Sequence, residues 1–552
     1  MATTEDLAKP PLQARIGRVV TASAAGTVFE WYDFFIFGSL AAIIAKHFFT
    51  SAGEVQGYIF ALLTFAAGFL VRPFGAIVFG HIGDRTGRKR AFLVTIALMG
   101  IATFAVGFLP DYTSIGPLAP WLLVLLRVVQ GFAVGGEYGG AAIYVAEHAS
   151  REKRGQATGW IQISASLGLF LALAVILITR TVIGEDAFGN WGWRIPFLLS
   201  AVLLAISLWI RLKLDESPVF RKIQEEGETS KAPLSETFRQ WPNLRLVLIV
   251  LFALLMGQGV VWYTAQFYTQ FFLERVMRVE PATVNLLIMI ITLISAPLHM
   301  AFATISDRIG RKPVMLFGLG LATVSIFPGF HLLTQAVNPA LVSASITSPV
   351  IVNADPADCA LQFDLIGKAK FTSSCDIARS ALTKMGVPYH TEKAPAGTRA
   401  VVHVGSLPVN SLDGRNLSNA ELVKQRGYFE NALNEALRAT GYPRVADPAQ
   451  IDMAGALAAL LIFVIAAAAL YGPQAATLVE LFPTRIRYTA MSVPYHIGVG
   501  WFGGFLPATA FAIVAATGNI FAGLWYPVII AGIGFVVTLF FLPETKGRDI
   551  TR

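Results

Sequence analysis

The chain is poor in charged residues. Asp, Glu, Lys and Arg make up only 14% of its 552 residues, against about a quarter in an ordinary globular protein. Two cysteines are too few for a small secreted disulfide scaffold, and 49 glycines are far too few for a collagen. A hydrophobic content of 55% excludes a disordered chain. The composition also argues strongly against a soluble enzyme.

What the chain has in abundance suits a membrane. Forty Phe and ten Trp stand beside the 49 Gly, a combination that fits helices packed in lipid. The net charge of +8 would be compatible with nucleic-acid binding. The distribution of that charge decides the question, because it follows the pattern of a multi-pass membrane protein.

Long uncharged runs predict twelve membrane-spanning helices, since a span needs about 20 mostly apolar residues. The stretch 488–543 has no charge and is long enough for two spans, with a break at 516–519. The sixth span is the shortest, with sixteen residues between Arg194 and Arg211. The twelve spans are expected near 19–45, 57–80, 91–109, 120–146, 157–179, 193–210, 246–272, 282–304, 313–335, 453–477, 488–515 and 520–542.

Lys and Arg predict the orientation. The two tails and the loops on their side of the membrane hold 25 of these residues, whereas the short loops opposite hold five. The positive-inside rule therefore places both termini in the cytoplasm. The segment 336–452 falls outside and carries eleven more Lys and Arg, but long loops translocate regardless of their charge.

An internal repeat divides the chain into two units. Residues 80–89 (GHIGDRTGRK) and 304–312 (TISDRIGRK) match at an offset of 223. Glu147…Arg154 and Glu480…Arg487 match at an offset of 333. The difference of 110 residues indicates that 336–452 is an insertion into the second of two six-helix units. Two such units joined by a long link are the architecture of a rocking transporter.

At these residues the chain resembles the major facilitator superfamily, and within it the metabolite:proton symporter family. The resemblance implies an all-α integral membrane protein of the bacterial inner membrane. Its expected parts are a six-helix bundle (1–210), a cytoplasmic linker (211–245), a second bundle in two pieces (246–335 and 453–552) and the insertion (336–452). The motifs that carry the resemblance are the two loop repeats, EWYDFF (30–35), RPFG (72–75), RVVQG (127–131), GGEYG (135–139), WRIPF (193–197), ESPVF (216–220), ELFPTRIR (480–487) and PETKG (543–547).

Ionisable residues inside the spans are costly and usually functional. Apart from histidines, they occur only in the first unit, at Glu30, Asp33, Arg72, Arg127 and Glu137. A helical rise of about 1.5 Å per residue puts Asp33 and Arg127 at the same depth and lets Arg72 meet Glu137. Glu30 and Asp33 stand on one helix face, where two close carboxylates favour holding a proton.

These charges predict proton coupling by Asp33, Glu30, Arg127 and Glu137. The alternative is that they only brace the helices. In the superfamily, an arginine placed like Arg127 is tied to proton transfer.

Several residues are candidates for holding a substrate. Arg72 and Arg127 are the expected anion anchors, because a guanidinium binds a carboxylate through two hydrogen bonds; Arg72 could instead be a fixed partner of Glu137. In the second unit Gln258, Tyr263 and His496 could line the cavity, or serve only in packing.

The repeated loop predicts a gate. Asp84 can meet a helix N-terminus or an arginine when the cytoplasmic side is closed, although the positive charges also fit the positive-inside rule alone. The expected gating residues are Gly80, Asp84, Arg85, Gly87, Arg88 and Lys89, with Asp307, Arg308, Gly310 and Arg311 in the second copy.

The insertion has a soluble composition and holds both cysteines. An extracytoplasmic location permits a disulfide between Cys359 and Cys375. Residues 419–440 read as an amphipathic helix and 400–404 as a strand, which together predict a small α+β domain at the outer mouth.

The chain shows no catalytic set, no metal-ligand spacing and no nucleotide-binding loop, so we expect no enzyme activity, no cofactor and no nucleic-acid partner. The main hypothesis is symport of a proton with a small organic anion, a mono- or dicarboxylate, by a monomer in the bilayer. Two alternatives stay open: uptake of a zwitterionic osmolyte such as a betaine or proline, and a membrane ligand sensor.

Overall fold

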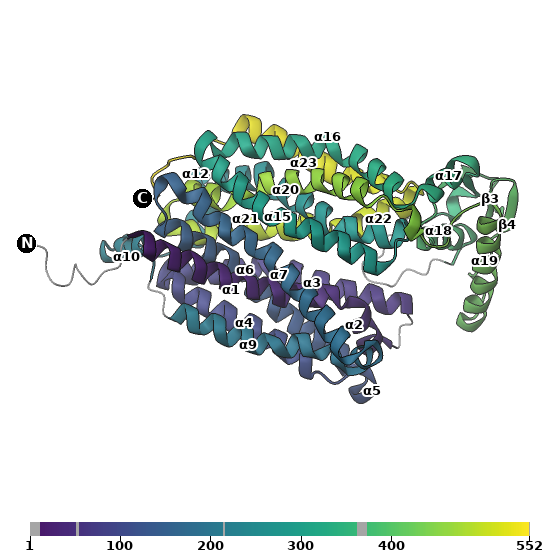
Figure 1. Ribbon diagram of the computed structural model, residues 1–552, viewed down its shortest axis with the longest axis horizontal. Coiled ribbons are helices and arrows are strands. Elements are labelled where there is room, and N and C mark those ends of the chain that lie inside the picture. Colours follow the sequence, from purple (N-terminus) through teal and green to yellow (C-terminus); the bar gives the residue numbers. More distant parts are fainter. Residues whose placement is uncertain (1–11, 51–53, 213–215, 361–371, 551–552) are drawn as a thin grey trace, which may run out of the picture.

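The computed structural model describes residues 12–50, 54–212, 216–360 and 372–550 as two helical bundles side by side (Figure 1). The start of the first helix and the end of the chain lie at one end of the molecule, which we call the terminal end. The insertion projects from the opposite end, which we call the insertion end.

The first half of the protein comprises residues 12–212. Its long helices are joined by short turns and helical segments. The elements are α1 (Leu12–Ser39), α2 (Ala41–Phe48), α3 (Glu54–Thr86), α4 (Arg88–Phe108), α5 (Tyr112–Ile115), α6 (Leu118–His148), η3 (Arg151–Lys153), α7 (Arg154–Ile183), α8 (Glu185–Ala187), η4 (Phe188–Gly192) and α9 (Arg194–Leu212).

The second half comprises residues 241–337 and 453–541, preceded by α10 (Pro218–Glu225) and α11 (Pro233–Arg239) in the linker. Its first span, Trp241–Val276, contains three π-helical stretches. The elements are α12 (Trp241–Val250), η5 (Leu251–Leu255), α13 (Met256–Tyr263), η6 (Thr264–Tyr268), α14 (Thr269–Phe271), η7 (Phe272–Val276), α15 (Pro281–Ile309), α16 (Arg311–Val337), α20 (Met453–Leu481), η10 (Thr484–Ile486), α21 (Arg487–Tyr495), η11 (His496–Gly503), α22 (Leu506–Thr517), η12 (Ala522–Leu524) and α23 (Trp525–Phe541).

The predicted fold is confirmed. Helices cover all twelve expected spans, and nine helical segments in the described ranges are long and apolar enough to cross a membrane. The first span is broken near Leu40, between α1 and α2. The expected break between the last two spans falls at Gly518, whose φ of +74° ends α22.

Small residues bring α3 and α6 into close contact. A Cβ atom on Gly131 would collide with the backbone of Gly68, and one on Gly135 would collide with the backbone of Arg72. Glycine permits this approach because it has no side chain. The contact places Arg72 of α3 and Glu137 of α6 in the same part of the bundle.

The insertion is the predicted α+β domain. Its four strands are β1 (Val350–Ala354), β2 (Tyr389–Lys393), β3 (Val401–Val404) and β4 (Leu407–Asn410), in the sheet order β2-β1-β3-β4. β1 runs parallel to β2 and antiparallel to β3, which pairs antiparallel with β4. The remaining elements are α17 (Pro339–Thr347), η8 (Pro356–Asp358), α18 (Ser374–Lys384), α19 (Asn419–Ala439) and η9 (Pro448–Gln450).

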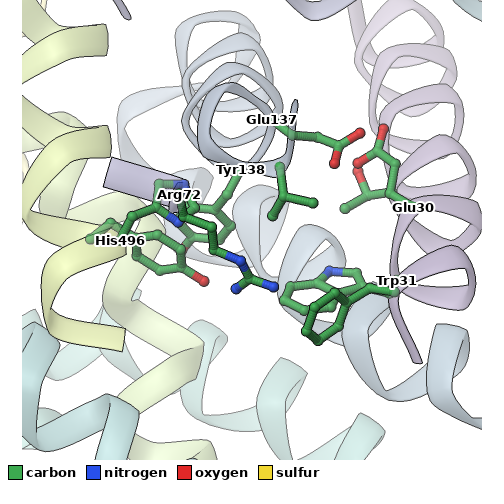
Figure 2. A pocket seen from close by; sticks show the side chains of 10 residues that line it. Glu30, Trp31, Arg72, Glu137, Tyr138 and His496 are labelled. Atoms are coloured by element: carbon green, nitrogen blue, oxygen red, sulfur yellow. The ribbon is translucent and has the colours of Figure 1, made fainter. Parts of the chain in front are cut away.

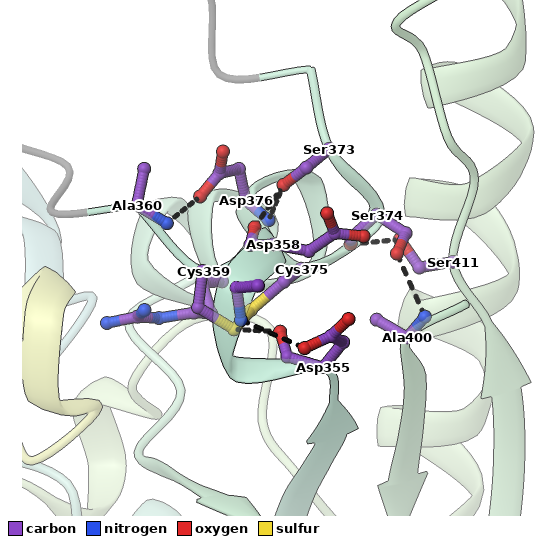
Figure 3. Close-up of a disulfide and its surroundings, with 12 residues drawn as sticks. Asp355, Asp358, Cys359, Ala360, Ser373, Ser374, Cys375, Asp376, Ala400 and Ser411 are labelled. Atoms are coloured by element: carbon purple, nitrogen blue, oxygen red, sulfur yellow. Dashed lines mark hydrogen bonds between the residues drawn. A yellow bond between two sulfur atoms is a disulfide. The ribbon is translucent and has the colours of Figure 1, made fainter. Parts of the chain in front are cut away.

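The structure contains the expected disulfide between Cys359 and Cys375 (Figure 3). It ties the segment after β1 to the first turn of α18. Polar contacts surround it: Asp376 accepts a hydrogen bond from the Ala360 backbone at 2.9 Å, and Ser374 accepts one from Ala400 at 2.9 Å. The disulfide therefore joins the loop that leaves β1 to the helix that packs on the sheet.

Breaking the disulfide should destabilise the insertion alone. For Cys359→Ser with Cys375→Ala we expect a loss of about 3 kcal/mol, because the closed loop no longer restricts the unfolded chain. Hydrogen exchange of the full-length protein should show faster exchange in α18 and the sheet, with α3 and α6 unchanged.

Reductant supplies the matched control. It should reproduce the effect in the wild type and add nothing in the double variant. Unchanged exchange in the insertion after reduction would contradict a stabilising disulfide.

Candidate functional site

A small cavity lies between the two halves near the middle of the bundle (Figure 2). The space left for a water-sized sphere is about 20 Å³, roughly enough for one water molecule. Residues from both halves line it: Thr27, Glu30, Trp31, Phe34, Arg72, Val134, Glu137 and Tyr138 from the first, and Tyr495 and His496 from the second.

Two carboxyl groups meet at one side of this cavity. Glu137 of α6 and Glu30 of α1 face one another across the cavity lining. Arg211 of α9 forms an ion pair with Glu30, and its side chain is only 2% exposed. Glu30 therefore lies between a second carboxyl and a buried guanidinium. The sequence predicted Asp33, not Glu137, as the carboxyl partner of Glu30.

Arg72 projects into the cavity from the other side (Figure 2). It is 1% exposed, lies beside Tyr263, and stands 4.4 Å and 4.2 Å from the ring centres of Phe34 and Phe69. Its Nε and Nη2 atoms have no hydrogen-bond partner in the described structure. The expected contact between Arg72 and Glu137 is not among the ion pairs of the described residues, because Glu137 turns towards Glu30.

Asp33 and Arg127 are joined through a polar chain outside the cavity lining. Asp33 lies beside Thr103, whose hydroxyl donates to the Met99 carbonyl at 2.9 Å and accepts a hydrogen bond from Gln130 Nε2 at 3.0 Å. Arg127 Nη1 donates to Gln130 Oε1 at 3.0 Å. The predicted nearness of Asp33 to Arg127 thus takes the form of a linkage through two intervening side chains.

The second half contributes mainly aromatic groups. Tyr495 stacks on Tyr138 of the first half, with ring centres 3.9 Å apart and planes 9° apart. His496 lines the cavity. Tyr263 is not among the lining residues but lies beside Arg72, which is. Gln258 is buried but is not among the lining residues. Aromatic faces from the two halves therefore meet across the cavity.

At the terminal end, Asp84 holds the start of a helix in the other half. Its two carboxylate oxygens accept hydrogen bonds from the backbone N–H groups of Tyr488 (3.1 Å) and Thr489 (2.9 Å) at the N-terminus of α21. Arg88 pairs with Asp84 at 2.6 Å. A carboxylate is favourable there because the N-terminus of a helix carries a partial positive charge.

Asp307 of the second half makes the equivalent contact with a helix of the first half. It accepts hydrogen bonds from Gly155 (2.9 Å) and Gln156 (2.7 Å) at the N-terminus of α7, and Arg311 pairs with it at 2.6 Å. We call the contacts of Asp84 and Asp307 the two latches. The repeated loop thus produces two equivalent bonds between the halves, as the gate hypothesis requires.

The residues of the second sequence repeat form ion pairs between the two halves, beside the latches. Glu147 of the first half pairs with Arg487 of the second at 2.7 Å, and Arg154 pairs with Glu480 at 2.9 Å. All four side chains are at most 4% exposed. Each repeat unit therefore gives one acid and one base to its counterpart.

The other expected gating residues have separate roles. Gly80 lies against the backbone of Thr489, where a Cβ would come within 2.9 Å, and Gly87 and Gly310 turn the chain with φ values of +120° and +108°. Lys89 Nζ donates to the carbonyl of Leu212 at 3.1 Å. Arg85 and Arg308 are exposed, which fits a role in orientation rather than in the latches.

Two further acids support the latches. Glu216 accepts from the backbone of Lys89 at 3.1 Å, and Glu544 accepts from the backbone of Arg311 at 2.9 Å, each at the start of a helix. Burial raises the pKa of Glu544, but N–H groups of Lys546, Arg311 and Lys312 outweigh this and lower the pKa below its usual value. Glu544 therefore stays ionised at neutral pH.

Sequence reasoning missed Arg211, which was counted as a charge flanking the sixth span. The short length of the sixth span could have indicated this residue, because a short helix places its last residue inside the bundle. Trp31 and Tyr138 were also missed, although each is adjacent to a predicted acid. With Arg211 included, the buried ionisable groups around the cavity comprise three acids (Glu30, Asp33 and Glu137) and three bases (Arg72, Arg127 and Arg211), whereas the sequence suggests an excess of one acid.

Family comparisons agree with this geometry. Residues 23–355 match the model of the Major Facilitator Superfamily, and residues 443–552 match that of "Sugar (and other) transporter". The chain belongs to the Major Facilitator Superfamily. The predicted superfamily is thereby confirmed, and so is the expectation that the chain is not an enzyme.

The chain is similar to several bacterial transporters. It is 35% identical over 350 residues to the glycine betaine/proline/ectoine/pipecolic acid transporter OusA of Dickeya dadantii, a match that covers 62% of this chain and 69% of the relative. It is 37% identical over 323 residues to the shikimate transporter of Escherichia coli, covering 57% and 72%. In fold it resembles the proton:xylose symporter XylE, with a TM-score of 0.63, 15% identity and 98% of each chain covered. The transporter prediction stands, and these relatives do not support a sensor.

Removing one latch should open the terminal end. In Asp84→Asn the charge at the start of α21 is lost and Arg88 loses its partner, so we expect a shift of about 1.4–2 kcal/mol towards the open form. A thiol introduced at Ser492, which is buried between α21 and α6, should react with a maleimide at least about tenfold faster.

Asp307→Asn should have a similar effect, since the second latch is equivalent. Exposed Asp186→Asn is the matched control and should leave the rate unchanged. Equal labelling rates in all of these variants would show that the latches do not hold the closed form.

Proposed function

We propose that the protein imports a small organic anion together with a proton. The observation that carries this proposal is the contact between Glu30 and Glu137 beside Arg211, in the cavity that also holds Arg72. Two carboxyl groups that face one another away from water cannot both ionise without a large cost, so one of them favours holding a proton. The pair is therefore suited to carry a proton next to an anion-binding arginine.

The proposed cycle uses the latches. Proton and anion enter from the insertion end, and the latches part so that the terminal end opens to the cytoplasm. The excess of Lys and Arg at the terminal end supports this orientation, in a bacterial inner membrane, with the insertion outside. A single chain contains both halves of the cavity, which supports action as a monomer.

Asp33 and Arg127 have a supporting part in the proposal. Asp33 lies beside Thr103, and hydrogen bonds join Thr103 to Gln130 and Gln130 to Arg127, so a change in the charge of Asp33 alters the polar surroundings of Arg127. An arginine in this place is tied to proton transfer in the superfamily that the sequence resembles. We assign both residues to the proton step, and Arg72 with Tyr263 and His496 to the anion.

Uptake of a zwitterion is the second candidate. The observation that favours it is the aromatic lining, since Trp31, Tyr138 and Tyr495 offer faces suited to a quaternary ammonium group. The names of the relatives include both kinds of solute, betaine and proline as well as shikimate. The unpartnered nitrogens of Arg72 support the anion as the first choice.

Neutralising the carboxyl pair should uncouple transport. In Glu137→Gln we expect gradient-driven accumulation of labelled shikimate in proteoliposomes to fall at least about tenfold, because the empty carrier no longer releases a proton before it returns. Exchange of labelled for unlabelled solute should persist, since it needs only the loaded carrier to rock.

Exposed Glu280→Gln is the control and should accumulate like the wild type. Full accumulation by Glu137→Gln would remove the pair from the proton step. Wild-type accumulation that survives collapse of the proton gradient by an ionophore would rule out proton coupling itself.

A further inference from the structure

The charges around the cavity can be counted. Asp33 and Arg127 are opposite in sign, are joined through Thr103 and Gln130, and lie outside the lining. Four charged groups remain: Glu30, Glu137, Arg72 and Arg211.

The titratable and charged groups that face the carboxyl pair and Arg72 come from seven elements of both halves. They are Glu30 and Asp33 from α1, Arg72 from α3, Arg127, Glu137 and Tyr138 from α6, Arg211 from α9, Tyr263 from α13, Tyr488 and Tyr495 from α21 and His496 from η11.

The tyrosines and His496 add no charge to this count. A buried phenol keeps its proton, and burial beside the guanidinium of Arg72 disfavours a charged imidazole. With both glutamates ionised, two negative charges balance the two arginines. When the pair holds one proton, a single negative charge remains between Glu30 and Glu137, and Arg211 compensates it.

Protonation of the pair therefore leaves Arg72 as the one uncompensated charge at the cavity. Its neighbours are the neutral Tyr263 and the rings of Phe34 and Phe69, and its Nε and Nη2 atoms are unpartnered in the described structure. A charge buried without compensation costs several kcal/mol. One carboxylate on the planar fork of Arg72 would remove that cost.

We infer that the cavity takes one proton and one monovalent anion as a neutral pair, so that the substrate is a monocarboxylate and transport moves no net charge. This rests on the proposed function and goes further, because it fixes the charge of the substrate and the ratio of proton to solute. A dicarboxylate would leave the loaded cavity at −1, and a zwitterion would leave it at +1.

Transport in proteoliposomes tests the inference directly. The probes are labelled shikimate, quinate and lactate as monocarboxylates, succinate and malate as dicarboxylates, and glycine betaine and proline as zwitterions. An inward gradient of one pH unit, with the membrane potential clamped at zero by valinomycin, should concentrate at least one monocarboxylate up to tenfold. Adding an inside-negative potential of about 59 mV, which is worth tenfold for one charge, should change that level little.

The outcomes separate the two proposals. Accumulation of a zwitterion or dicarboxylate, or a monocarboxylate level that rises about tenfold with the potential, overturns the neutral-pair inference and leaves proton symport standing. Accumulation of no probe under the pH gradient overturns the proposed function and this inference with it.

Stability gives a second readout that does not depend on transport. Glu137→Gln fixes the pair in the charge state of its singly protonated form, with one negative charge, so the purified variant should have a lower Tm than the wild type and regain it on addition of the transported monocarboxylate. Glu137→Gln with Arg72→Gln restores the balance of charge, and its loss of stability should be smaller than the sum of the single losses. Additive losses, with Glu280→Gln unchanged as control, would contradict the charge count.

Discussion

A charge buried away from water must be compensated, and this constraint governs how the two halves of the protein meet. Two of the buried ion pairs beside the latches join opposite halves: Glu147 with Arg487, and Arg154 with Glu480. Separating the halves therefore removes partners from several buried charges together. These pairs therefore stabilise the arrangement in which the two halves meet at the terminal end.

The same helices join the gate to the cavity. α3 carries Arg72 at the cavity and Asp84 at the latch, about 18 Å apart along one helix at 1.5 Å per residue. α21 receives the latch at Tyr488 and Thr489 and carries Tyr495 to the cavity. A change of charge beside Arg72 therefore acts on a helix whose other end is held by the latch.

The sequence predicts the gate better than the cavity, and the reason is physical. The latches follow from a repeated local motif at the ends of helices, so the repeat and the family resemblance together point to Asp84 and Asp307. The carboxyl pair depends on how helices are rotated about their axes. Depth along a helix can be counted from the sequence, but rotation is set by packing, for example where Gly131 and Gly135 meet α3. For this reason Glu137 meets Glu30 and Arg211 rather than Arg72.

The position of the insertion also reflects the division of the protein into two halves. Its hydrogen bonds to the bundle, within the described residues, run to the second half: Arg278 donates to the carbonyl of Pro443, Asn338 to that of Met277, and Tyr389 to that of Gly518. Most of these contacts use backbone groups at helix ends, which side-chain patterns do not reveal. Because the insertion is bound to one half, it moves with that half as a unit. A rocking movement of the two halves would therefore leave the contacts within the insertion unchanged, including its disulfide.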